Sequence, residues 1–183
     1  MTDSRSGVWA WLRASVGIVF GLAVASATLW RWHDIASAEA WLNARLVKIT
    51  GLANADSIGA AVIFPLDHRW VGFMVSSGCS VAMLLIPPIV LASTLVGFRR
   101  ISISRGLNAL AIAVVLLVTV NQLRLAAVVV SMRTWGFRLG YERSHVLIGS
   151  AITTVGLIAV AILFVVLVSR SRRHGRGAVA GVS

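Results

Sequence analysis

The chain has 183 residues, of which 58% are hydrophobic and only 13% charged, and its mean hydropathy is +0.88. This composition excludes an ordinary soluble domain and predicts a single membrane domain. The net charge of +11 comes almost entirely from arginines beside apolar runs, a pattern typical of membrane orientation rather than of nucleic-acid binding. One cysteine excludes an intramolecular disulfide. Because the chain has no metal-ligand motif, we expect no metal or other cofactor.

The first apolar run covers residues 14–30 and ends at Trp30-Arg31-Trp32. At 1.5 Å per residue it reaches about 25 Å, enough to cross a bilayer with tryptophans at the interface. The alternative is a cleaved signal peptide, because Ala25-Ser26-Ala27 resembles a cleavage site. Either way, residues 31–79 form an external segment.

That external segment begins with an amphipathic helix, predicted from Asp34 to Leu52. Its apolar residues recur every three or four positions, at Ile35, Ala38, Leu42, Leu46 and Ile49. Glu39, Arg45 and Lys48 occupy other faces. The helix is too polar to span a bilayer, so we expect it to lie on the membrane surface. Two β-rich runs then flank the turn at 65–69 and predict a short β-hairpin that leads to Cys79.

Three further apolar runs predict spans at residues 80–97, 106–130 and 146–168. Pro87-Pro88 should kink the first of these. Residues 131–144 are predicted to be a loop, and the arginine-rich tail at residues 169–183 to be disordered. The fold class is therefore an all-α integral membrane protein with about four transmembrane helices, the amphipathic helix and the hairpin.

Basic residues give the orientation. Arg99, Arg100 and Arg105 place the loop after the second span in the cytoplasm, as the tail arginines do for the C-terminus. Four spans then put both termini inside. The 131–144 loop also carries arginines, but the parity of four spans places it outside.

Three chemically distinctive residues meet near the outer face in this topology. Cys79 opens the second span, where the unpaired N–H groups of a helix N-terminus favour a thiolate. Arg124 lies in the third span, about 9 Å below its outer end, and a charge there costs roughly 2.5–3.5 kcal/mol on insertion. His145 opens the fourth. Together they suit acyl transfer: the thiolate attacks a carbonyl to form a thioester, His145 shuttles the proton, and Arg124 stabilises the oxyanion.

Asn121 lies one helical turn before Arg124, and we expect it to hold the guanidinium in place. Structural alternatives remain. A buried cysteine packs as a small hydrophobe, and an arginine near a span end can snorkel to the interface or bind neighbouring amides. His33 and His68 are also outside and compete with His145 as the base.

These motifs carry a family resemblance. Cys79-Ser80 opening a span, Asn121-x-x-Arg124 late in the next and His145-x-x-x-Gly149 opening the last resemble the exosortase/archaeosortase family over roughly residues 58–165. A final His is closer to the bacterial exosortase branch, although Val81 stands where members often have Gly.

The resemblance implies a bacterial plasma-membrane cysteine transpeptidase or protease with its active site at the outer face. Its partners would be exported proteins that end in a sorting motif, a transmembrane helix and a basic tail. A competing hypothesis is a non-catalytic membrane subunit or small transporter in which Arg124 binds an anion or a partner helix. Acylation of Cys79, as in a lipoprotein, is a weaker third.

Overall fold

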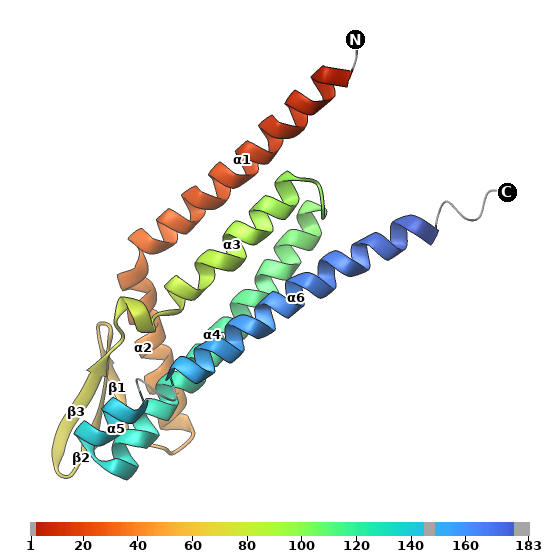
Figure 1. The fold of residues 1–183 in the computed structure, drawn as a ribbon. Coiled ribbons are helices and arrows are strands. Elements are labelled where there is room, and N and C mark those ends of the chain that lie inside the picture. Colours follow the sequence, from red (N-terminus) through yellow and green to blue (C-terminus); the bar gives the residue numbers. More distant parts are fainter. Residues whose placement is uncertain (1–2, 145–148, 178–183) are drawn as a thin grey trace.

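The computed structural model describes residues 3–144 and 149–177, and most of them are helical (Figure 1). The helices are α1 (Asp3–Trp30), α2 (Trp32–Ile49), α3 (Val81–Gly97), α4 (Ile103–Trp135), α5 (Phe137–Arg143) and α6 (Gly149–Gly177). An antiparallel sheet of order β1-β2-β3 contains β1 (Asp56–Ile58), β2 (Ala61–Leu66) and β3 (Arg69–Met74), and the 3-10 turn η1 (Ser77–Cys79) follows it. The prediction of a mainly helical chain with a β-hairpin is confirmed.

Four long helices, α1, α3, α4 and α6, run beside one another, whereas α2, the sheet and α5 gather at one end (Figure 1). Within residues 3–144 and 149–177, α4 alone is long and apolar enough to cross a membrane by itself. α3 and the 150–166 part of α6 are shorter apolar helices. α1 and α2 pass the same criterion only as a pair, bent by 62° at their junction. Four transmembrane helices therefore stay a prediction.

The long helices approach closely at small residues. A Cβ atom on Gly17 of α1 would lie 2.9 Å from the Cα of Gly97, at the end of α3. On α6, a Cβ at Gly156 would lie 2.8 Å from Val120 of α4. Close contact through small residues is typical of helices packed within membranes.

Two segments predicted to lack structure are helical. α4 continues to Trp135, and after Gly136, with φ of +80°, α5 occupies most of the remaining 131–144 loop. α6 continues to Gly177, so the prediction of disorder is wrong for residues 169–177. The physical reason is the same in both cases: arginine marks a segment as solvated but is also a strong helix former.

α2 uses two different faces. Leu46 and Ile49, from the predicted apolar stripe, are 41% and 81% exposed, as a helix lying on a membrane surface requires. The face that packs on the protein carries small residues with two polar ones among them, namely Ala36, Glu39, Ala40, Asn43, Ala44 and Val47. Its short side chains allow the sheet and α4 to approach closely, and the predicted stripe gave no sign of this contact.

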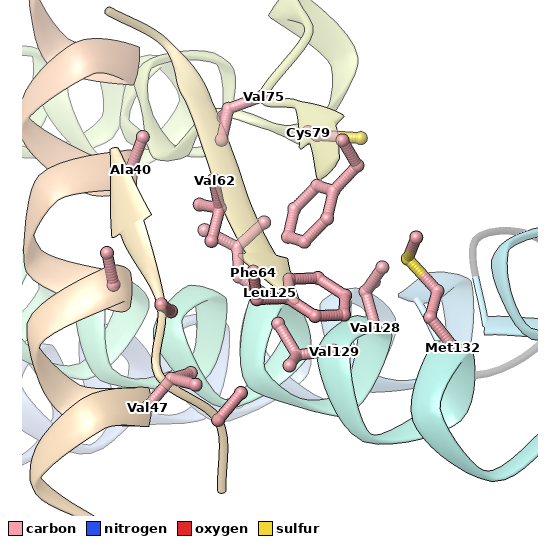
Figure 2. Packing of buried hydrophobic residues seen from close by; sticks show 14 of the residues in the cluster. Ala40, Val47, Val62, Phe64, Val75, Cys79, Leu125, Val128, Val129 and Met132 are labelled. Atoms are coloured by element: carbon pink, nitrogen blue, oxygen red, sulfur yellow. The ribbon is translucent and has the colours of Figure 1, made fainter. Parts of the chain in front are cut away.

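The hairpin turn is tighter than predicted, because only Asp67 and His68 connect β2 to β3. Their φ values of +47° and +62° suit a two-residue hairpin turn. β1, which the sequence analysis missed, pairs with β2. The sheet covers a core shared with α4, built largely from Val62, Phe64, Phe73, Val75, Leu125, Val128, Val129 and Met132 (Figure 2). Cys79 lies at the margin of this core, so the sheet helps to fix the segment that carries the thiol.

Candidate active site

Cys79 is the last residue of η1, which connects β3 to α3. The carbonyl of Ser76 accepts hydrogen bonds from the N–H groups of Cys79 and Ser80, at 2.9 and 3.0 Å, which closes the η1 turn. Ser80 then caps α3, because its hydroxyl accepts from the N–H of Ala82 at 3.2 Å. The expected placement of the cysteine beside a helix N-terminus is confirmed, and its side chain is buried (Figure 2).

Arg124 reaches the cysteine from α4. Its Nη2 atom donates to the sulfur of Cys79 at 3.5 Å, and its Nη1 atom donates to the hydroxyl of Thr153, on α6, at 3.3 Å. The whole residue is only 8% exposed. The guanidinium therefore lies inside the protein and joins three elements, rather than snorkelling to an interface.

Asn121 does not take the place expected for it. Its side-chain amide donates to the carboxylate of Glu39, on α2, and no described hydrogen bond joins it to Arg124. The expectation that Asn121 directly holds the guanidinium is therefore wrong. The amide nitrogen of Asn121 donates to the carboxylate, and its Oδ1 atom, the one that could accept from a guanidinium, is buried without a hydrogen-bond partner among the described residues.

Glu39 is the site residue that the sequence analysis missed. Its carboxylate accepts from the Ser80 hydroxyl at 2.7 Å, from the Val81 N–H at 3.0 and 3.1 Å, and from Asn121. The residue is 5% exposed. One carboxylate thus ties α2 to the start of α3 and to the middle of α4, directly beside the cysteine.

Burial raises the pKa of Glu39 above its ordinary value of 4.5, since the anion loses its hydration. The hydrogen bonds from Ser80, Val81 and Asn121, and the nearby charge of Arg124, act in the opposite direction and only partly offset it.

A second polar layer supports the first. The amide of Asn43 donates to both the backbone carbonyl and the side-chain oxygen of Gln122, each at 3.1 Å. The Gln122 amide in turn donates to the backbone carbonyl of Glu39 at 3.4 Å. These bonds fix the position of α2 against α4, and with it the position of the carboxylate.

His145, the predicted base, lies outside the described residues. Of the competing histidines, His33 is in the first turn of α2 and His68 is in the hairpin turn. Both are exposed, so neither shares the buried surroundings of Cys79 and Arg124. In the part of the chain that the structure describes, no group of three or more potential ligands is placed to hold a metal ion.

The arrangement provides a buried thiol, a guanidinium in contact with it, and a buried carboxylate that binds the start of α3 and Asn121 of α4. Comparison with known proteins found no matching family model, no matching curated protein and no matching solved structure.

Proposed function

We propose that the chain is a membrane cysteine transpeptidase of the exosortase/archaeosortase type. It cleaves C-terminal sorting signals of exported proteins and transfers these proteins to an acceptor at the cell surface. The observation that carries the proposal is the buried contact between Arg124 and the sulfur of Cys79. An arginine that is costly to bury, in contact with the one thiol of the chain, has a clear use in thiolate chemistry.

In the proposed reaction, the thiolate of Cys79 attacks the carbonyl of the scissile peptide bond. Arg124 stabilises the negative charge on the carbonyl oxygen in a site that excludes most water. His145 gives a proton to the leaving amine, and the substrate remains bound to Cys79 as a thioester. A nucleophile of the acceptor then displaces the sulfur, which regenerates the thiolate and leaves the substrate joined to the acceptor.

The proposed setting is the bacterial plasma membrane, crossed by α1, α3, α4 and α6, with Cys79 at the outer face. The start of α1, the turn between α3 and α4 and the end of α6 lie at the same end of the bundle (Figure 1). That arrangement supports two cytoplasmic termini, because this end carries Arg99, Arg100 and the arginines of the tail. The sheet lies at the opposite end.

Single cysteines placed at the two ends test this orientation. In a Cys79→Ala background, we expect Arg69→Cys, in the hairpin, to react with a membrane-impermeant maleimide in intact cells. Ser104→Cys, in the exposed first turn of α4, should react only after the cells are opened. The reverse pattern would place the cysteine site in the cytoplasm and contradict surface processing.

Arg124→Lys tests the chemical role of the guanidinium. Lysine keeps the charge but lacks the planar fork that reaches Cys79 and Thr153 together, so we expect processing to slow about 100-fold. The assay follows cleavage of an exported protein of the same organism that ends in a motif, an apolar helix and a basic tail. Arg138→Lys, at an exposed arginine of α5, is the matched control and should process at the wild-type rate. Full activity of Arg124→Lys would favour a simple electrostatic or anion-binding role.

A further inference from the structure

An apolar groove runs between α1, α3 and α4, toward the α3–α4 turn and away from the cysteine site. It has a volume of about 180 Å³. Its walls include Phe20 and Val24 from α1, Ala92 and Val96 from α3, and Leu107 and Leu110 from α4. α1 packs on α3 through small residues such as Gly17, which leaves room between α1 and α4 for a hydrocarbon chain.

A second cavity, of about 400 Å³, adjoins the groove at the α3–α4 turn. Arg99 and Arg100 contribute to its lining, and it shares Val96 and Ile103 with the groove. Both arginines are exposed, and no described carboxylate forms an ion pair with either. The two cavities therefore adjoin one another, the first almost wholly apolar and the second lined in part by two arginines.

The backbone at Arg99 adds an independent observation. The N–H of Arg99 bonds to the carbonyl of Val96, and the N–H of Arg100 bonds to that of Leu95, both at 2.9 Å. These two bonds form a common kind of helix C-terminus, in which the residue just after the helix cap adopts a positive φ and is usually glycine. Here that residue is Arg99, with φ of +53°. An arginine there carries a steric cost that glycine avoids. Stability of the turn alone does not account for the guanidinium at this position.

We propose that this site binds one anionic phospholipid of the cytoplasmic leaflet. An acyl chain occupies the apolar groove, and the phosphate headgroup lies against Arg99 and Arg100. Charge complementarity selects this occupant over the helix of a proposed substrate, because the basic tail of such a substrate would be repelled by the same arginines. The site is separate from the cysteine chemistry, and its place in the cytoplasmic leaflet rests on the proposed orientation of the chain.

The experiment uses the full chain in mild detergent, titrated with phosphatidylglycerol or with phosphatidylcholine of the same acyl chains. Native mass spectrometry counts the lipid retained. We expect preferential retention of phosphatidylglycerol. Affinity should fall roughly fivefold in Arg99→Gly or Arg100→Gln and about 30-fold in the double variant, from about 1 kcal/mol for each basic residue at an anionic surface. Arg138→Gln, at the other end of the molecule, should retain the lipid as the wild type does.

Two variants, Arg99→Gly and Ile103→Asp, distinguish a loss of lipid binding from a loss of folding. Arg99→Gly should melt at no lower temperature than the wild type, because glycine adopts this φ freely. Ile103→Asp puts a negative charge where the two cavities meet, at an exposed first position of α4 that favours an acidic residue. It should remove the preference for phosphatidylglycerol. Equal retention of both lipids by the wild type, or undiminished retention of phosphatidylglycerol by the double variant and Ile103→Asp, would overturn the proposal.

Discussion

Cys79→Ala is expected to abolish substrate processing, with a loss of roughly a thousandfold or more, the scale that follows removal of an enzyme's nucleophile. The protein level should not change, because the thiol is small and its removal leaves only a small cavity in the adjoining core. Cys79→Ser should be almost as inactive, since a hydroxyl is a far weaker nucleophile than a thiolate unless a well-oriented base activates it.

A covalent trap separates this outcome from a loss of binding. Each variant is incubated with a tagged substrate, and a hydroxylamine-sensitive adduct is sought on the chain. The wild type should form the adduct transiently, and Cys79→Ala should bind the substrate without forming it. His145→Ala should stall before the thioester forms. Ser77→Ala, two residues from the cysteine, serves as the matched control and should behave as the wild type. Normal processing by Cys79→Ala would contradict the enzyme proposal and favour a non-catalytic membrane subunit.

Glu39→Ala is expected to have the largest effect on stability. It leaves the Ser80 hydroxyl, the Val81 N–H and the Asn121 amide without their acceptor in a buried site. Each buried donor without a partner costs about 1–3 kcal/mol, and we expect a total near 3–5 kcal/mol after partial relaxation. Thermal unfolding in mild detergent measures the change. Glu142→Ala, at an exposed glutamate of α5, should alter stability by no more than about 0.5 kcal/mol.

The difference in unfolding free energy between the wild type and Glu39→Gln is expected to change with pH in a definite direction. Burial raises the pKa of Glu39, so the folded state holds a proton on this carboxyl up to a higher pH than the unfolded chain does. The stability that this proton provides is fully present below the ordinary value of 4.5 and is lost as the pH rises through the folded value. Glutamine does not titrate. The unfolding free energy of the wild type, relative to that of Glu39→Gln, should therefore fall as the pH rises through this window. A difference that grows with pH would mean that Arg124 and the hydrogen bonds stabilise the anion more than burial opposes it.

The sequence was sufficient to predict the elements that depend on local pattern. Apolar runs located the long helices, and β-rich runs located the hairpin. The topology predicted from the apolar runs placed Cys79 and Arg124 near the same face of the membrane, and the structure joins these two residues by a hydrogen bond. The sequence could not show which polar side chains hydrogen-bond to one another, because partners that lie 41 and 82 residues apart leave no periodic signal.

Glu39 illustrates the limit. On a helical wheel Glu39 lies beside Asn43 on a face made mostly of alanines. The hydropathy of such a face does not predict whether it is buried or exposed. The signal that could have identified it is the run of small residues itself, because alanines at helical spacing indicate a face that another element approaches closely. A glutamate on such a face must be buried, and a buried carboxylate needs donors.

The polar junction at Glu39 also has a consequence for the order in which the protein is assembled during synthesis. The carboxylate and Ser80 emerge from the ribosome well before Asn121 and Arg124, so the nascent segment around Cys79 lacks two of its anchors until α4 has been made. Until then the carboxylate remains hydrated and the thiol has no guanidinium beside it. The thiol of Cys79 therefore gains its final surroundings only late in synthesis, after α4 has been made.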